Sequence, residues 1–351
     1  MDRELRKIAI VAEEFALRSP PQQLLDRLLV GYQRNGQFHR LEGCQVWLVP
    51  LDRNHPEIER RIKDFGLHVA EDKESAVVDA DGVVVAWRNS GAKANDDLLR
   101  TVLQRMRKGA ACFVHGALAS GTASAKELVA LATARGVTLC AGTSTAVTFR
   151  LPDVDLPSKA KTREALIVVQ GPFPEAEHEA LEGVLPVIER RRGGESGVRS
   201  VRFVEGDEVW RAGREGLWSW SLLASAISRS NTVQGDPVKD GRTQDIVGQG
   251  LIQSLAKSPR GWLLEHHDRL RTTLLVLDGA VADYNFAIRL ANGSTVSAQL
   301  YRPPEPAQEQ FSRLTAVIED FFRTGKAPWR IERSLLVAGW LDEFRQRHTA
   351  R

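Results

Sequence analysis

The sequence has only three cysteines, and their spacing matches neither a disulfide framework nor a zinc site. We therefore expect a reducing compartment and assign no metal ligands. No apolar run approaches the roughly 18 residues that a membrane-spanning helix needs. Near the N-terminus a short apolar stretch is followed at once by acids, which is unlike a signal peptide. These absences predict a soluble, cytoplasmic protein.

The sequence also lacks a strong charge of either sign. It has 48 basic and 45 acidic residues, which gives a net charge of +3 over 351 residues. Such a balance gives no reason to expect nucleic acid or an anionic membrane as a partner. The length suits about two domains.

A glycine-rich loop is missing where the first strand meets the first helix. The β-rich run at residues 7–11 leads through a loop with Pro20 and Pro21 into an amphipathic helix. A dinucleotide-binding fold would place G-x-G-x-x-G between the two, so that the diphosphate could approach the backbone at the helix N-terminus. This chain instead has two carboxylates there, in the run Ala12-Glu13-Glu14-Phe15-Ala16-Leu17.

The first 140 residues show a regular alternation of strands and helices. Five runs are apolar on both faces, as buried parallel strands are: residues 8–11, 46–51, 82–87, 111–114 and 137–140. Residues with helical spacing lie between them. The alternation predicts an α/β fold, a Rossmann-like doubly wound parallel sheet with right-handed crossovers.

The pattern changes after about residue 150. Three strands follow one another without helices between them, separated by Gly279 and by the tight-turn pair Asn292-Gly293. We expect an antiparallel meander in an α+β domain with a mostly antiparallel, open sheet. Its exposed apolar residues would favour a homo-oligomer, a dimer or larger. These residues are Leu274, Val276, Tyr284, Phe286 and Ile288.

The expected organisation has three parts. Residues 1–150 form a Rossmann-like, nucleotide-binding-type domain, residues 151–330 an α+β substrate and oligomerisation domain, and residues 331–351 a C-terminal helix. The helix has an apolar face that needs a partner, and we expect it to return to the first domain. That face consists of Leu335, Leu336, Gly339, Trp340 and Phe344.

A family resemblance rests on four stretches: "GCQVWLVPLDRN", "DADGVVVAWRN", "AKELVALATARGVTLCAGTSTAVTFR" and "IEDFFRTGKAPWRIERSLLVAGWLDEF". In order, they resemble the second strand, the strand that carries the nicotinamide-side loop, the end of the first domain and the closing segment of the superfamily of glucose–fructose oxidoreductase, inositol dehydrogenase and MocA. The resemblance implies a nicotinamide-dependent oxidoreductase, with NAD or NADP, that acts on a sugar or polyol. It also implies a small, carbohydrate-like ligand.

The lysine that is usual in this family is absent. Members carry Glu-Lys-Pro at the end of the strand before the "AKELV" helix, and these positions are here His115, Gly116 and Ala117. His115 can take over acid–base work, because histidine exchanges a proton near neutral pH. Alternatively, it is a strand-end histidine bonded to the neighbouring backbone.

The expected cofactor positions lie at the ends of the first-domain strands. Asp52 can accept both ribose hydroxyls, with Arg53 beside it for a 2′-phosphate, or it can cap a turn before His55. Because Glu13 and Glu14 add negative charge where the diphosphate would lie, we expect NAD or NADP to bind weakly or not at all. The remaining candidates are Ala12, Trp87 and Arg88.

A second group of candidates lies in "FPEAEHEALEGVLPVIERR". His178 and Glu182 are four residues apart and share a helix face, and Glu179 is their neighbour. A histidine with a carboxylate one turn away can act as an oriented general base or supply two metal ligands. The alternative is an exposed, acid-rich first turn that answers the helix dipole.

The leading hypothesis is therefore a nicotinamide-dependent oxidoreductase for a sugar or polyol with a degenerate cofactor loop. In it, His178, Glu179 or His115 moves the hydroxyl proton. The missing glycines and the missing lysine together favour another class, a ligand-binding or assembly protein without hydride transfer. A lyase or hydrolase that uses the same scaffold without redox chemistry is the third possibility.

Overall fold

The computed structural model describes residues 3–12, 15–50, 55–87, 93–232, 234 and 244–350. Contacts divide the chain into two compact units. Unit 1 is Met1–Val147 with Pro303–Asp342, and unit 2 is Thr148–Arg302 with Glu343–Arg351. The contacts end the central part of unit 2 at Arg302, whereas the sequence placed the end of the second domain at residue 330.

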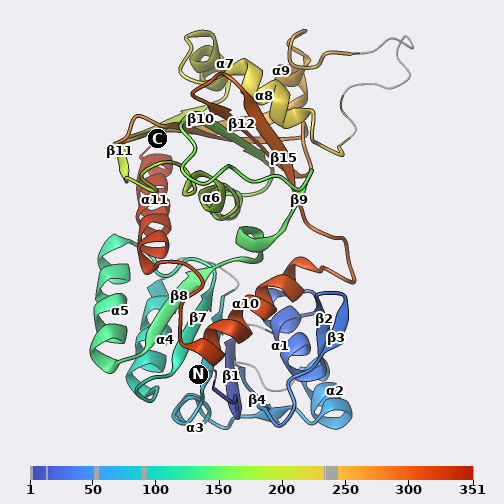
Figure 1. Ribbon diagram of the computed structural model, residues 1–351, viewed down its shortest axis with the longest axis vertical. Coiled ribbons are helices and arrows are strands. Elements are labelled where there is room, and N and C mark those ends of the chain that lie inside the picture. Colours follow the sequence, from blue (N-terminus) through green and yellow to red (C-terminus); the bar gives the residue numbers. More distant parts are fainter. Residues whose placement is uncertain are drawn as a thin grey trace. The chain divides into compact units, whose positions relative to one another are not determined.

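Unit 1 is built on a six-stranded sheet in the order β5-β4-β1-β6-β7-β8 (Figure 1). All neighbouring strands pair in parallel, which confirms the predicted Rossmann-like sheet. The strands are β1 (Lys7–Ala12), β4 (Gln45–Pro50), β5 (His68–Val69), β6 (Gly82–Ala86), β7 (Ala111–His115) and β8 (Thr138–Gly142). A small hairpin stands apart from this sheet and consists of β2 (Tyr32–Arg34) and β3 (Gln37–His39).

The helices of unit 1 are α1 (Pro20–Val30), α2 (Pro56–Phe65), α3 (Lys73–Val77), α4 (Lys93–Arg105), α5 (Thr122–Arg135), α10 (Gln310–Thr324) and most of α11 (Ile331–Thr349). They cover both faces of the sheet, because neighbouring strand residues such as Val83 and Val84, whose side chains point to opposite faces, belong to two different hydrophobic cores. One core includes α4 and α5, and the other includes α1 and α10.

The two C-terminal helices explain why residues 303–342 belong to unit 1. α10 places five apolar residues in the same core as α1: Phe311, Leu314, Ile318, Phe321 and Phe322. In α11, Ala338 is buried in the core with α4 and α5, and Leu335 packs against it. Phe344 belongs to unit 2, where its ring stacks on Trp262 with the centres 4.0 Å apart.

Unit 2 is built on a seven-stranded sheet in the order β11-β12-β13-β10-β14-β15-β9. All strand pairs except β10 with β13 are antiparallel, which confirms the predicted α+β class. The strands are β9 (Phe149–Leu151), β10 (Thr162–Val169), β11 (Val198–Glu205), β12 (Lys257–His266), β13 (Arg271–Asp278), β14 (Tyr284–Leu290) and β15 (Thr295–Tyr301). The helices are α6 (Glu175–Ile188), α7 (Asp207–Arg214), α8 (Trp220–Ile227) and α9 (Leu251–Leu255).

The predicted three-strand meander is wrong in one respect. β14 and β15 form an antiparallel hairpin around Asn292-Gly293, as expected. β13 does not pair with β14, because β10 lies between them, parallel to β13 and antiparallel to β14. Residues Ala165–Val169 are all buried, and a strand buried on both faces suits the centre of a sheet.

The apolar residues on which the oligomer prediction rested are not exposed. Leu274, Val276, Tyr284, Phe286 and Ile288 are all 5% exposed or less. α7 and α8 lie on one face of the unit 2 sheet and α6 on the other (Figure 1). A homo-oligomer stays a prediction, but these residues give it no surface on which to form.

Candidate functional site

The carboxyl edge of the parallel sheet is the place where open α/β sheets hold ligands. The strand order runs outward in both directions from β1 and β6, so the connections diverge between these two strands. At this edge Ala12 pairs with Ala86, Ala86 with His115, and His115 with Gly142. The predicted residues Ala12 and His115 thus lie on one edge, and Trp87 follows Ala86 directly.

Trp87 and His115 are both packed at this edge. The Trp87 indole N–H donates to the Ala117 carbonyl oxygen at 3.2 Å. The His115 ring is 6% exposed and stacks on Phe311, with the ring centres 5.9 Å apart. Four further candidates lie outside the described residues: Glu13, Asp52, Arg53 and Arg88.

The N-terminus of α1 lacks the donors that a dinucleotide diphosphate needs. Pro20 and Pro21 are the first two residues of this helix, and proline has no N–H group. The Ser19 N–H already donates to the Ala16 carbonyl oxygen at 3.1 Å. Of the N–H groups in the first turn, that of Gln22 is left to donate to a diphosphate. The residues present therefore do not fit NAD or NADP in the mode in which a helix N-terminus binds the diphosphate.

α6 holds the second predicted group on a buried face. His178 and Glu182 are 3% and 2% exposed, and the His178 Nε2 lies 3.8 Å from the Glu182 Oε1. This distance is too long for a hydrogen bond, and the His178 Nε2 has no hydrogen-bond partner among the described residues. Glu179 is half-buried. An exposed, acid-rich first turn, the alternative interpretation, is therefore wrong for His178 and Glu182.

Tyr284 of β14 is a polar group near α6 that sequence reasoning did not place in a site. Burial raises the pKa of Tyr284 to about 12, although the positive charge of Arg302 opposes this shift. The Arg302 guanidinium lies 4.1 Å from the centre of the Tyr284 ring. The negative charge of Glu179 raises the same pKa. Tyr284 therefore stays protonated at neutral pH and can donate a hydrogen bond, but it cannot serve as a base.

Glu177 is a second polar residue that sequence reasoning missed. It is 0% exposed, and its Oε1 accepts from the Arg260 Nε at 2.6 Å and from the Trp262 Nε1 at 3.3 Å. Arg260 also donates to the Gly171 carbonyl oxygen at 2.7 Å. These partners come from β12, so spacing within the helix could not reveal them. The ion pair fixes the first turn of α6 to the sheet, next to His178.

A second buried ionic network connects β12 to the chain after α6. The His266 Nδ1 lies 2.9 Å from the Glu195 Oε1, and the His266 Nε2 lies 2.9 Å from the Thr272 Oγ1. The Arg191 Nη1 lies 3.1 Å from the Glu195 Oε2. Both ring nitrogens of His266 are bonded within this network, so neither is left for a substrate, and the network is structural. His266, the last residue of β12, is buried, and His267 in the following turn is exposed.

In the described ranges, no three His, Cys, Asp or Glu side chains are grouped so that they could hold a metal ion. Nor does any helix in those ranges have the length and apolar character needed to cross a membrane. Cys112 and Cys140 are buried, as expected of core residues, and Cys44 is partly buried.

No protein-family model matches the sequence, and no curated protein sequence matches it. The solved structure of GenD2 from gentamicin A biosynthesis, in complex with NAD, is similar to this chain with a TM-score of 0.60 at 14% identity, covering 100% of this chain and 96% of that chain. For scyllo-inositol dehydrogenase from Lactobacillus casei, the TM-score is 0.58 at 10% identity, with 96% and 94% covered. Biliverdin reductase from Synechocystis sp. PCC 6803, with biliverdin and NADP+, has a TM-score of 0.54 at 13% identity, with 97% and 98% covered.

These structures cover nearly the whole chain, although few residues are identical. They include dehydrogenases of the type that the sequence resembles. The chain therefore shares its fold with these solved structures, which is the fold that the resemblance implied.

Proposed function

We propose that this chain is an oxidoreductase that acts on a sugar or polyol and holds a nicotinamide cofactor only weakly. The supporting observation is the carboxyl edge at β1 and β6, where Ala12 and Ala86 end the paired strands with small side chains. Structures with this fold include an inositol dehydrogenase and a complex with NAD. A small polar, carbohydrate-like molecule is the substrate class that we propose.

The weak binding of the cofactor follows from the start of α1. A hydrogen bond to a charged group contributes roughly 1.5–3 kcal/mol. The two N–H groups missing at Pro20 and Pro21 therefore weaken binding of a diphosphate by about 3–6 kcal/mol, at least on the order of a hundredfold. The cofactor must then rely on other contacts, and it dissociates readily.

We assign proton transfer to the buried face of α6. The His178 Nε2 is buried and no described residue is bonded to it, so it can bond to a substrate hydroxyl once the packing around α6 opens to admit the substrate. Glu182, one turn later, attracts and positions the ring once it is protonated. Glu179 and His115 are the other candidates for this role, and Tyr284 can donate a hydrogen bond to a substrate oxygen.

Calorimetry with both nicotinamide cofactors in both redox states tests the cofactor proposal. We expect millimolar dissociation constants for the unmodified protein. The double variant Pro20→Ala, Pro21→Ala restores two N–H groups, and its affinity should rise at least tenfold. The matched control Pro157→Ala, Pro328→Ala changes two exposed prolines elsewhere and should bind as weakly as the unmodified protein. Micromolar binding by the unmodified protein would contradict the proposal.

Nicotinamide absorbance in the presence of myo-inositol, scyllo-inositol or glucose, at saturating cofactor, tests the reaction. We expect turnover to fall at least a hundredfold in His178→Asn, because general acid–base catalysis contributes about that much or more. Glu182→Gln should reduce turnover less, since Glu182 acts through His178. Unchanged turnover in His178→Asn would remove this residue from the site.

The start of α1 also favours a second candidate, a non-redox ligand-binding or assembly protein on this scaffold. Such a protein would bind a polyol in calorimetry without oxidising it, with either cofactor and in the Pro20→Ala, Pro21→Ala variant. Turnover of a polyol by the unmodified protein or by the Pro20→Ala, Pro21→Ala variant would exclude the non-redox function.

A further inference from the structure

An open pocket of about 700 Å³ lies at one end of the unit 2 sheet, apart from the sites described above. This volume is in the range of small-molecule sites. Among the lining residues are four arginines and two acids: Arg163, Arg269, Arg271, Arg289, Glu164 and Asp268. The balance of charge among them decides what the pocket can bind.

Both acids are already neutralised. Glu164 lies opposite Arg271 on β13 and opposite Arg289 on β14, in register with both. It forms an ion pair with Arg271, and its Oε2 lies 3.7 Å from the Arg289 Nε, so one carboxylate serves two guanidinium groups. Asp268 binds the Nε of the buried Arg191 at 2.8 Å. The lining is therefore left with a surplus of positive charge.

Arg163 contributes one part of this surplus. It is exposed, and no acid in the described ranges is paired with it. In the pairing of β10 with β14, Thr162 faces Leu290 and Glu164 faces Arg289. Because Leu290 and Arg289 are consecutive, no residue of β14 lies opposite Arg163. Such a β-bulge turns a side chain away from the regular alternation of a strand. It explains how three consecutive residues of β10 can line one pocket.

Arg269 contributes the other part. It lies in the turn between β12 and β13, is exposed, and is likewise without an acidic partner in the part of the chain that the structure describes. Its φ of 69° is in the left-handed region, which few residues with a side chain adopt. This conformation lets the turn present a long cationic side chain at the rim of the pocket.

Neutral groups hold the other two arginines in place. The Arg271 Nη1 donates to the Gly216 carbonyl oxygen at 3.1 Å. The Arg289 Nη2 donates to the Ser221 Oγ at 2.5 Å and to the Ser219 Oγ at 3.3 Å. Guanidinium groups that are oriented in advance lose less freedom when an anion binds.

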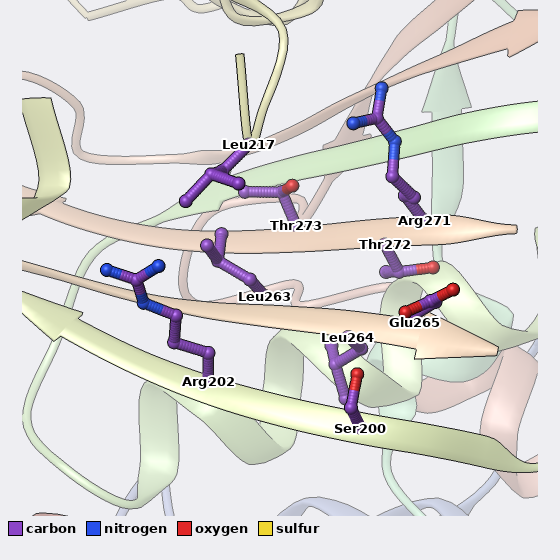
Figure 2. Close-up of a pocket in the computed structure, with 9 residues that line it drawn as sticks. All are labelled: Ser200, Arg202, Leu217, Leu263, Leu264, Glu265, Arg271, Thr272 and Thr273. Atoms are coloured by element: carbon purple, nitrogen blue, oxygen red, sulfur yellow. The ribbon is translucent and has the colours of Figure 1, made fainter. Parts of the chain in front are cut away.

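A smaller pocket of about 190 Å³ shares Arg271 with the first one. Figure 2 shows Arg271, Thr273 and Leu263 on the same side of the sheet, with Leu217 facing them from a loop. The two leucines form an apolar wall next to the arginines. A ligand with its anionic group at the arginines can place a small carbon skeleton against this wall.

We propose that the two adjoining pockets bind the phosphate monoester of a small polar molecule. A phosphate monoester has close to two negative charges at neutral pH and three acceptor oxygens. Guanidinium groups match these oxygens in geometry as well as charge. The pockets lie within unit 2, and this proposal does not rest on the proposed oxidoreductase function.

Calorimetry with glucose 6-phosphate at low ionic strength tests the proposal, with inorganic phosphate and glucose as comparison probes. We expect a micromolar dissociation constant for glucose 6-phosphate, and binding at least tenfold weaker for inorganic phosphate and for glucose. Added salt should weaken the binding because the site is open to solvent. Absence of binding by glucose 6-phosphate, or equal affinity for inorganic phosphate, would overturn the proposal.

Variants locate the binding. Arg163→Gln, Arg269→Gln removes two exposed cations and should lower the affinity for glucose 6-phosphate at least tenfold. The matched control Arg40→Gln, Arg192→Gln makes the same change of net charge at exposed positions elsewhere, and its affinity should stay within twofold. Equal losses in both variants would show a general charge effect and overturn the site. Leu217→Ala should weaken binding of glucose 6-phosphate but not of inorganic phosphate; equal effects on both would remove the apolar wall from the proposal.

Discussion

Arg260 balances the charge of a carboxylate that water does not reach. Arg260→Leu would leave Glu177 buried without its ionic partner, and breaking a buried pair in this way costs about 3–5 kcal/mol. We expect the free energy of unfolding, measured by urea titration, to fall by about 3 kcal/mol or more.

The matched control is Arg202→Leu. Arg202 pairs with Glu208 at 3.0 Å, but its side chain is 49% exposed. The expected loss is therefore below about 1 kcal/mol. If the two variants lost the same small amount, Arg260 would contribute no more than an ordinary surface pair.

Glu195 makes stability depend on pH in the acid range. Burial alone would raise the pKa of Glu195, but the hydrogen bond and charge of His266 and the charge of Arg191 outweigh burial and lower it to about 2. The folded pKa thus lies below the unfolded value of about 4.3. The stabilisation is complete above that value and is lost as the pH falls through it toward the folded pKa.

We therefore expect the unmodified protein to exceed Glu195→Gln in free energy of unfolding by on the order of 2–3 kcal/mol at neutral pH. The difference should shrink below about pH 4. Urea titrations of both proteins over this range measure it. A difference that is constant down to about pH 3 would mean that Glu195 is not the titrating group.

At this scale, helical spacing located His178 and Glu182 on one face, but it could not reveal that the face is buried. The burial depends on a sheet whose strands are far away in the sequence. The same limit applies to Arg163, Arg271 and Arg289, which lie on three strands. They meet only because β10 lies between β13 and β14, and the expected meander had no place for β10.

Among the elements, α10 packs so closely on β6 that a methyl group would not fit between them. A Cβ at Gly82 would lie 2.2 Å from the Phe322 ring. We expect Gly82→Ala to lower the free energy of unfolding by about 1–3 kcal/mol, because the ring must shift within a packed core. Urea titration measures this change.

Gly339→Ala in α11 is the control. Its Cβ would meet the Thr122 hydroxyl at 3.3 Å, which a small movement relieves, and alanine favours a helix by up to about 1 kcal/mol. This variant should be close to neutral. Equal destabilisation by both variants would argue against the close packing of α10 on β6.

Five of the six strands of the unit 1 sheet were predictable because each is an apolar run, whereas β5 has two residues, neither of them fully buried, and was missed. Their bounds agree with the structure to within a residue or two, as β6 and β7 show. The start of α1 was not predictable. Pro20 and Pro21 suggest a loop, but they occupy the first turn of a helix, where no N–H group is needed for a helical hydrogen bond. The hairpin of β2 and β3 has three-residue strands, too short to show a period.

At the scale of the whole molecule, unit 1 depends on the far end of the chain. A chain that ends after Arg302 lacks α10 and α11 and would expose the core residues that α10 covers. We expect it to lose cooperative unfolding in urea, followed by circular dichroism. A chain that ends after Arg347 keeps Phe344 and should unfold cooperatively. If the shorter chain also unfolded cooperatively, unit 1 would not need these helices.

Unit 1 consists of two separate chain segments, and this delays its folding during translation. Residues 148–302 are made between the two segments of unit 1. At the usual speed of translation, their synthesis takes roughly 10–30 s. During that interval the sheet face around Gly82 has emerged, but Phe322 does not yet exist to cover it. The nascent protein therefore exposes an apolar surface, to which chaperones bind, until its last helices leave the exit tunnel. Nearly all of the unit 2 chain has been made by then, so unit 2 can fold earlier.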